Sequence, residues 1–228
     1  MRSLTASEAL EEAVERFHPR LAMACSFQKE ESVMLDMLLA IERHHPSLVM
    51  ACSFQKEESV LIDMLMRIEP TARVFTIDTG VLFPETYEVW RKVEDRYGLR
   101  VEVVDATPPN GTPWSASNCC GRRKVDALEH ALAGADAWIT GIRREQSPTR
   151  ADAQPVEWDD ARGVWKFNPL AEWTDRDIWS YVHEHDLPYH PLHDRGYESI
   201  GCAPCTLPGN GREGRWAGQD KTECGLHV

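Results

Sequence analysis

Four cysteines in two pairs are the residues of this sequence best suited to chemistry. Cys119 and Cys120 are adjacent, Cys202 and Cys205 form a Cys-x-x-Cys pair, and Cys224 follows closely. Four thiolates brought together by a fold bind a metal centre unless the compartment is oxidising. Adjacent side chains diverge on a helix or a strand, so they suit a single zinc ion poorly, whereas a cubane cluster offers a separate iron to each thiolate. We therefore favour a [4Fe–4S] cluster on Cys119, Cys120, Cys202 and Cys205 over zinc, and over four unrelated buried cysteines.

The composition is that of a folded globular protein. The 228 residues include 42% hydrophobic residues and eight tryptophans, enough for one domain with a substantial core. No signal peptide opens the sequence, so we expect a cytoplasmic location, where structural disulfides are rare. The apolar stretches near 33–41 and 60–68 are short and broken by charges, so we expect no membrane span. The formal net charge of −12 argues against a nucleic-acid partner.

Basic residues nevertheless gather at three places. They are Arg122-Arg123-Lys124, Arg143-Arg144, and the pair Arg212 and Arg215. An anionic substrate of an acidic protein needs such a locally basic site, and arginine forks suit phosphate and sulfate oxygens. Solvated basic surface is the alternative for Arg122, Arg123 and the C-terminal pair.

The sequence contains an internal repeat. Residues 23–33 recur identically at 50–60, and each copy has the pattern of a short buried strand, a polar turn and an apolar helix, which is half of a βαβ unit. We interpret this as a segmental duplication in which one copy occupies the functional site. The second copy leads directly into the next predicted strand, so we assign the function to it.

The remaining elements predict an α/β fold. Strands are expected at 21–25, 48–52, 73–78, 100–105 and 137–143, helices at 5–17, 85–97, 118–134 and 174–185, and a hairpin at 156–167. Strand, helix and strand in alternation predict a parallel twisted sheet with helices on both faces. Residues from His190 onward have little regular pattern. We therefore divide the chain into an α/β nucleotide-binding domain at 1–190, with the duplicated segment at 21–68, and a mostly irregular C-terminal tail at 191–228.

Two polar segments follow predicted parallel strands, at the edge where open sheets bind ligands. Ser53–Ser59 lies between a strand and a helix, where free backbone N–H groups and the helix dipole favour an anion. An ordinary helix cap is the alternative, because this segment matches neither Gly-rich phosphate motif. Asp78-Thr79-Gly80 ends the next strand, and a plain turn is the alternative there. Cys25 and Cys52 lie inside apolar strands and are interpreted as small core residues.

Five motifs, in order, resemble those of the assimilatory adenylyl-sulfate reductases, the iron–sulfur branch of the APS/PAPS (sulfonucleotide) reductases. They are Cys-Cys-Gly-Arg-Arg-Lys-Val at 119–125, Gly-Ile-Arg-Arg-Glu-Gln-Ser-Pro-Thr-Arg at 141–150, Asn-Pro-Leu-Ala-Glu-Trp-Thr at 168–174, the run from Leu187 to Thr206 that contains Cys-Ala-Pro-Cys, and Glu-Cys-Gly-Leu-His at 223–227. The resemblance covers residues from about 48 to the end. The first repeat is not a family feature, and Gln55 stands where the family more usually has glycine.

The resemblance implies an adenine-nucleotide α-hydrolase-like fold with a modified pyrophosphate loop. It implies an enzyme of sulfate assimilation and cysteine biosynthesis that reduces adenylyl sulfate to sulfite and AMP. The electrons would come from thioredoxin or glutaredoxin, and the cluster would hold and tune the site rather than pass electrons. A homo-oligomer is left open.

The resemblance also implies roles for individual residues. Lys124 is expected to lie between cluster and substrate sulfate, one helical turn after Cys120, and His227 to assist catalysis. The expected substrate-binding residues are Ser53, Phe54, Glu57, Ser59, Ile77, Asp78, Arg143, Arg212 and Arg215.

Cys224 is the expected nucleophile. Once four cysteines are assigned to the cluster, it is the only remaining cysteine that lies in a polar, Gly-flanked segment rather than in an apolar strand. Its thiolate would attack the sulfate sulfur and form an S-sulfocysteine, from which thioredoxin releases sulfite. Three alternatives remain. One is a reductase of 3′-phosphoadenylyl sulfate, whose branch lacks the cluster cysteines. The others are a non-catalytic cluster or zinc module, and an ATP-dependent pyrophosphatase, which would need a Gly-rich loop absent here.

Overall fold

The computed structural model describes residues 47–109, 122–216, 223 and 226. Its helices and strands run in the order β1 (Leu48–Ala51), α3 (Lys56–Ile68), β2 (Arg73–Asp78), α4 (Pro84–Tyr97), β3 (Glu102–Asp105), α6 (Arg122–Ala131), β4 (Ala137–Ile139), β5 (Val156–Asp159), β6 (Val164–Phe167) and α7 (Asp175–Glu184). Short 3₁₀ turns lie at Arg144–Gln146, Pro148–Arg150, His193–Arg195 and Ala203–Cys205. The expected first strand and first helix, together with the first copy of the repeat, lie outside the described residues.

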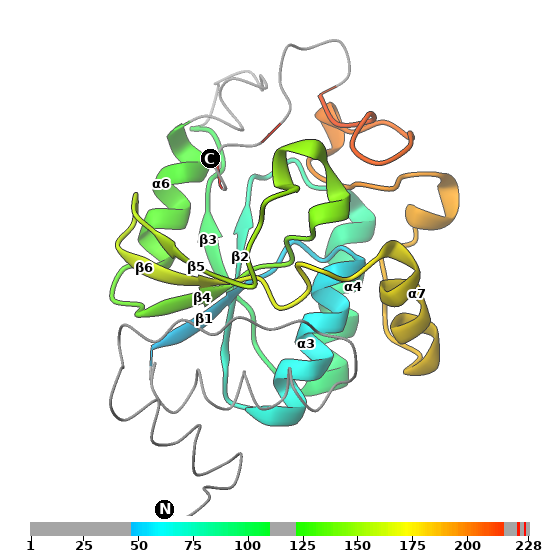
Figure 1. Cartoon of the computed structure of the whole chain (residues 1–228). Helices are drawn as coiled ribbons and strands as arrows, with labels where there is room; N and C mark the ends of the chain where they lie inside the picture. The colour runs from blue at the N-terminus through cyan, green and yellow to red at the C-terminus, as the bar shows by residue number, and fades with distance from the viewer. Residues whose placement is uncertain (1–46, 110–121, 217–222, 224–225, 227–228) are drawn as a thin grey trace, which may run out of the picture.

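The strands form a six-stranded sheet in the order β3-β2-β1-β4-β6-β5 (Figure 1). All neighbouring strands run parallel except β5 and β6, which form the antiparallel pair at one edge. The predicted parallel sheet and the predicted hairpin are therefore both confirmed, and the hairpin lies at an edge of the sheet. β1 comes from the second copy of the repeat and lies at the centre of the sheet, paired with β2 on one side and β4 on the other.

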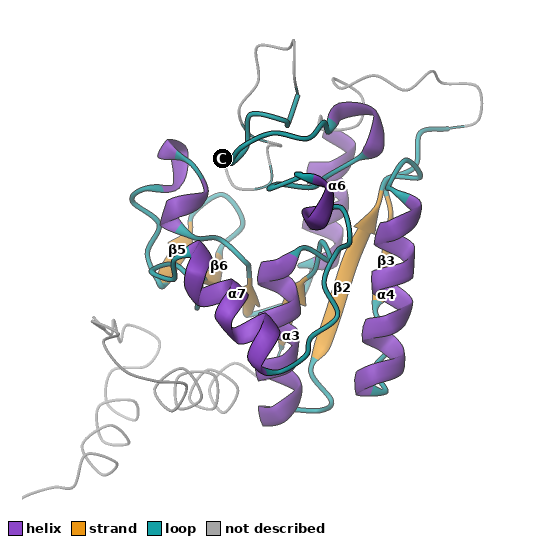
Figure 2. Cartoon of the chain, turned by 90° about the vertical axis from the view of Figure 1, so that its right-hand side faces the viewer, coloured by secondary structure: helices purple, strands orange, loops and turns teal. Residues whose placement is uncertain are grey.

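Successive residues of β1 point to opposite faces of the sheet, and each face has its own core. Leu48 and Met50 pack with apolar residues of α3, α4 and α7, whereas Val49 packs with Phe75 and with Leu128 of α6. Helices therefore cover both faces, as predicted. Figure 2 shows α3 and α7 side by side on their face of the sheet.

Local sequence explains where the helices begin and end. Pro84 opens α4, and Gly98, at φ 65°, ends it in the left-handed conformation that glycine adopts without strain. The Thr174 hydroxyl accepts a hydrogen bond from the backbone N–H of Asp177 and caps α7. On α3, the Asp63 carboxylate accepts hydrogen bonds from the Tyr97 and Tyr181 hydroxyls, each at 2.9 Å, and so ties α3 to α4 and α7.

Beyond α7 the described chain is mostly irregular, as expected. Isolated bridges join parts of this segment to one another and to the loop after β2. One bridge joins Leu82, in the loop after β2, to Cys202. No helix among the described residues is long and apolar enough to cross a membrane.

A buried histidine joins this C-terminal segment to α4. The His190 ring is fully buried, with Nε2 3.0 Å from the Thr86 hydroxyl oxygen, and its Nδ1 accepts the Leu192 backbone N–H at 3.3 Å. Because Nδ1 is the acceptor, Nε2 carries the proton of the neutral ring and donates to Thr86. Burial and the neighbouring charge of His193 lower the pKa of His190 from 6.5 to about 4.

We expect this histidine to make the free energy of unfolding depend on pH. Well above pH 6.5 the ring is neutral in both states. As the pH falls from 6.5 towards 4, His190 binds a proton in the unfolded state but not in the folded state. The free energy of unfolding therefore falls by up to about 3 kcal/mol. Urea unfolding of the wild type and of His190→Gln across this range tests the effect. The variant should lose less stability on acidification, and parallel curves for the two proteins would contradict the assignment.

Candidate active site

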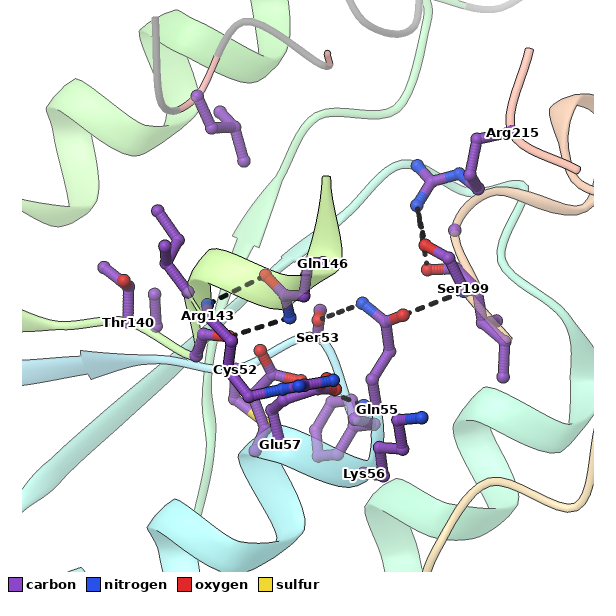
Figure 3. A pocket seen from close by; sticks show the side chains of 18 of the residues that line it. Cys52, Ser53, Gln55, Lys56, Glu57, Thr140, Arg143, Gln146, Ser199 and Arg215 are labelled. Atoms are coloured by element: carbon purple, nitrogen blue, oxygen red, sulfur yellow. Dashed lines mark hydrogen bonds and ion pairs between the residues drawn. The ribbon is translucent and has the colours of Figure 1, made fainter. Parts of the chain in front are cut away.

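A cavity of about 470 Å³ lies at the carboxyl ends of the central parallel strands (Figure 3). Its walls come from the loop after β1, the first turn of α3, the ends of β2 and β4, the first turns after β4, and the segments 198–202 and 211–215. Open parallel sheets bind ligands at this edge, because the loops of several strands converge there. The predicted ligand edge and the cavity coincide.

The loop after β1 turns sharply into α3. Phe54 has φ 58°, an uncommon conformation for a side chain of this size, and its ring stacks on Trp90 of α4 with the ring centroids 5.3 Å apart. Gln55 precedes the helix, and its backbone N–H donates to the Glu58 carboxylate at 3.1 Å in a capping box. The first turn of α3 thus faces the cavity, where its dipole favours an anion.

Gln55 also connects this loop to the segment that carries Cys202. Its side-chain amide donates to the Ser53 hydroxyl at 3.1 Å, and its side-chain oxygen accepts the Ile200 backbone N–H at 2.8 Å (Figure 3). Sequence reasoning treated Gln55 only as a departure from the family. No local pattern could have revealed a partner so distant in the chain.

Arg143 is a buried charge at the centre of a network of carboxylates. Its side chain is only 4% exposed and donates to Glu57 at 2.9 and 3.0 Å, to Glu145 at 3.1 Å and to Asp175 at 3.1 Å. Asp175 also pairs with Lys56 of α3. These bonds satisfy a buried charge that would otherwise be costly, and they fix the loop after β4 against the first turns of α3 and α7.

Glu58 is a buried acid on the same cavity wall. Burial and the charge of Glu57 raise the pKa of Glu58 to about 7. A Cβ added at Gly141, which follows β4, would lie 2.6 Å from a Glu58 carboxyl oxygen and 3.1 Å from the Glu57 Cβ, so a larger residue there would crowd the first turn of α3. Burial and Glu58 also raise the pKa of the Cys52 thiol well above its ordinary value. Cys52 therefore stays a neutral thiol and does not suit nucleophilic catalysis.

Basic side chains line the side of the cavity nearest the C-terminal segment. They come from α6 (Lys124), from the turn at 148–150 (Arg150) and from the C-terminal segment (Arg212 and Arg215). The Arg215 guanidinium lies 4.5 Å from the Trp216 ring centroid and donates to the Ile200 carbonyl at 3.2 Å. This wall is locally cationic although the whole chain is acidic.

Cys202 and Cys205 form a tight turn beside this wall. Both are buried, and they pack with Trp216 and with the apolar loop after β2. The Cys205 backbone N–H donates to the Cys202 carbonyl at 3.1 Å, and the Thr79 hydroxyl lies 3.2 Å from the Cys202 sulfur. The predicted partners Cys119 and Cys120 lie outside the described residues, and the described residues alone contain no group of three or more metal-binding side chains.

The predicted site residues fall into three groups. Those that line the cavity are Ser53, Phe54, Glu57, Ile77, Lys124, Arg143, Cys202, Arg212 and Arg215. Ser59, Asp78 and Cys205 lie nearby but are not part of its lining: the Ser59 hydroxyl donates to the Pro188 carbonyl at 2.7 Å, and the Asp78 carboxylate accepts from the Tyr87 hydroxyl at 2.9 Å. Cys119, Cys120, Cys224 and His227 lie outside the described residues.

Comparison with known families identifies the family of the chain. Residues 47–208 match the phosphoadenosine phosphosulfate reductase domain, over more than half of the chain. The chain belongs to this family. The resemblance inferred from the motifs is thereby confirmed, and the matched segment contains the second copy of the repeat and not the first.

Curated relatives carry two names. An adenosine 5′-phosphosulfate reductase of Salinibacter ruber is 46% identical over 70% of this chain and 69% of its own length. One of Bacillus cereus is 43% identical over 97% of this chain and 90% of its own length. A phosphoadenosine 5′-phosphosulfate reductase of Gloeobacter violaceus is 46% identical over 96% of this chain and 87% of its own length. The family is therefore one of sulfonucleotide reductases, which are oxidoreductases.

Solved structures support the fold. The phosphoadenylyl-sulfate reductase of Candida auris has a TM-score of 0.64 at 24% identity, over 90% of this chain and 99% of that one. The FMN adenylyltransferase of Candida glabrata has a TM-score of 0.59 at 19% identity, over 90% of this chain and 75% of that one. The expected α/β fold is confirmed.

Proposed function

We propose that this protein reduces adenylyl sulfate to sulfite and AMP, with electrons from thioredoxin or a related dithiol protein such as glutaredoxin. The observation that carries the proposal is one cavity that combines a strand–loop–helix anion site with Lys124, two C-terminal arginines and Cys202. A nucleotide with a sulfated phosphate would bind with its phosphate at the anion site and its sulfate at the cationic side chains. The relatives' names support the same reaction class.

The nucleotide end of the substrate fits the loop side of the cavity. The Ser53 hydroxyl and the first turn of α3 can receive phosphate oxygens, and Ile77 offers an apolar wall for the adenosine. Three carboxylates and the Trp173 carbonyl together accept five hydrogen bonds from Arg143, so its guanidinium is fully hydrogen-bonded to protein groups. We therefore expect Arg143 to support the cavity wall through Glu57 and Asp175 and to influence substrate binding indirectly.

The sulfate end would face the cationic wall. Lys124, Arg212 and Arg215 can hold sulfonate oxygens and stabilise the negative charge that develops on the leaving phosphate. The Cys224 thiolate attacks the sulfate sulfur, a sulfur–sulfur bond forms, and the sulfur–oxygen bond to AMP breaks with its electron pair leaving on the phosphate. A thioredoxin thiolate then attacks Cys224, sulfite leaves with the sulfur–sulfur electron pair, and the second thioredoxin thiol resolves the mixed disulfide and regenerates Cys224. His227 is proposed to assist at the thiol.

The described half of the cluster site has suitable donors for a [4Fe–4S] cluster. Cys202 and Cys205 present two buried thiols from one turn. The Thr79 hydroxyl can donate a hydrogen bond to a Cys202 thiolate, and such hydrogen bonds to the sulfur ligands are common around iron–sulfur clusters. Cys119 and Cys120, which immediately precede α6, are the proposed other ligands. When bound, the cluster would supply a fixed, charged neighbour to Lys124 and the sulfate end of the substrate.

The main competing function is reduction of 3′-phosphoadenylyl sulfate. The name of the Gloeobacter violaceus relative favours it, and its identity to this chain equals that of the Salinibacter ruber relative. We favour the unphosphorylated nucleotide because this chain has all four cysteines expected of the cluster-bearing branch. A cytoplasmic location and a role in cysteine biosynthesis belong to the same proposal.

Steady-state assays with both nucleotides test the proposed substrate. Anaerobically purified protein and reduced thioredoxin should release sulfite from adenylyl sulfate with a specificity constant at least ~10-fold higher than from the 3′-phosphorylated form, a difference of about 1.4 kcal/mol. Both nucleotides should be measured with the same protein preparation and the same thioredoxin. Equal or reversed specificity constants would assign the chain to the other branch.

A further inference from the structure

Glu223 takes no part in the chemical steps of the proposed reaction, but several side chains donate hydrogen bonds to it. Its carboxylate accepts two parallel bonds from Arg150, at 3.1 and 3.0 Å, one from Arg212 at 2.9 Å, and one from the Thr149 hydroxyl at 2.9 Å. The Glu223 side chain is only 10% exposed. Four bonds from three side chains to one nearly buried carboxylate form a specific binding site for that carboxylate rather than a loose surface pair.

The partners of Glu223 belong to the cavity. Arg150 and Arg212 both line it, although one comes from the turn after β4 and the other from the segment after Cys205. Burial raises the pKa of Glu223, but the bonds and charges of Arg150 and Arg212 outweigh this effect and keep the pKa below its ordinary value. The carboxylate is therefore ionised at neutral pH and bridges two walls of the cavity.

A second described residue of the same segment also contacts the cavity. Leu226 lines it and packs against the apolar residues around Cys202 and around α6. Glu223 and Leu226 thus contact the cavity walls, the first through ionic hydrogen bonds and the second through apolar packing. In the sequence, Cys224 directly follows Glu223.

We propose that Glu223 is a positioning residue, which anchors the C-terminal segment to Arg150, Arg212 and Thr149 and thereby places the thiol of Cys224 at the cavity. This inference rests on the proposed function, in which Cys224 is the nucleophile. Glu223 itself forms and breaks no bond in the reaction. Its effect is on the alignment of the thiol, which determines the rate of attack.

Glu223→Gln is the sharpest test, because it keeps the shape of the side chain and removes its charge. One carboxylate oxygen becomes an NH₂ group that faces arginine donors, so at least one charge-assisted bond is lost. We expect the single-turnover rate of S-sulfocysteine formation to fall about 10- to 100-fold. Equilibrium binding of adenylyl sulfate should not weaken, because neither arginine is removed. Glu223→Asp, which keeps the charge, should recover part of the rate.

The matched control is Glu213→Gln. Glu213 lies in the same segment but is exposed, and its loss should change neither the rate nor the binding. A rate equal to wild type in Glu223→Gln, or weaker nucleotide binding that accounts for the whole effect, would overturn the proposal.

A measurement without substrate separates this inference from the proposed function. Iodoacetamide alkylation of nucleotide-free protein, mapped to the Cys224 peptide by mass spectrometry, should be several-fold faster in Glu223→Gln than in wild type or Glu213→Gln. If wild type forms no S-sulfocysteine, the proposed function fails, and the alkylation rates still decide whether Glu223 anchors the segment. Equal alkylation rates in all three proteins would refute the anchor whatever the activity.

Discussion

Replacing Cys224 with serine is expected to abolish sulfite release, by at least about a thousandfold in turnover, because the reaction loses its nucleophile. A serine hydroxyl stays protonated near neutral pH and cannot form the sulfur–sulfur bond that thioredoxin cleaves. Cys52, which lines the cavity, cannot substitute, because burial and Glu58 raise the pKa of its thiol. Sulfite release in the presence of reduced thioredoxin is the measurement.

Cys224→Ser should retain the rest of the site. Adenylyl sulfate should bind with its wild-type affinity, and iron and sulfide content should not change, since Cys224 is not a proposed ligand. Cys52→Ala is a suitable companion variant and should still release sulfite. Turnover by Cys224→Ser above about one per cent of wild type would exclude this cysteine as the nucleophile.

The second large effect is expected at Cys202. Wild-type protein purified anaerobically should be brown and contain about four irons and four sulfides per chain, as a [4Fe–4S] cluster requires. Cys202→Ser should lose most of this iron and most of the activity, because one ligand is lost and the Thr79 hydroxyl loses its sulfur partner.

Analysis of iron, sulfide and zinc distinguishes a [4Fe–4S] cluster from a zinc site. Cys52→Ala serves as the control, since Cys52 is buried in the core beside β1, and it should keep the iron. A wild-type protein that is colourless and active with one zinc per chain would refute the cluster. Unchanged iron and sulfide in Cys202→Ser would remove Cys202 from the ligand set.

Local patterns in the sequence were sufficient for the fold. Hydrophobic runs separated by polar turns predicted the strands and helices, and the helices expected at 85–97 and 174–185 are α4 and α7, which are bounded by Gly98 and Thr174 respectively. The choice of the second repeat copy rested on its continuity with the next strand, and that copy forms the central strand β1. β4 is shorter than expected and ends at Ile139, because the chain leaves the sheet to form the cavity wall.

The sequence predicted many of the residues that line the cavity, but it did not predict which side chains bond to one another. A basic cluster was evident at Arg143, yet its bonds to Glu57 and Asp175 depend on residues that only the fold brings together. The same holds for Gln55 with Ile200 and for Glu223 with Arg150. Hydrophobic periodicity reports which face of an element is buried, and it contains no information about which charged side chains meet across the molecule.

The most direct test of the account is to trap the covalent intermediate. The protein is incubated anaerobically with adenylyl sulfate and without thioredoxin, then digested and mapped by mass spectrometry under non-reducing conditions. We predict one added SO₃ group per chain, located on the Cys224 peptide, together with one equivalent of AMP, and release of that group as sulfite when reduced thioredoxin is added. Formation of sulfite and AMP with no modified cysteine, or an SO₃ group located on another cysteine, would contradict the account.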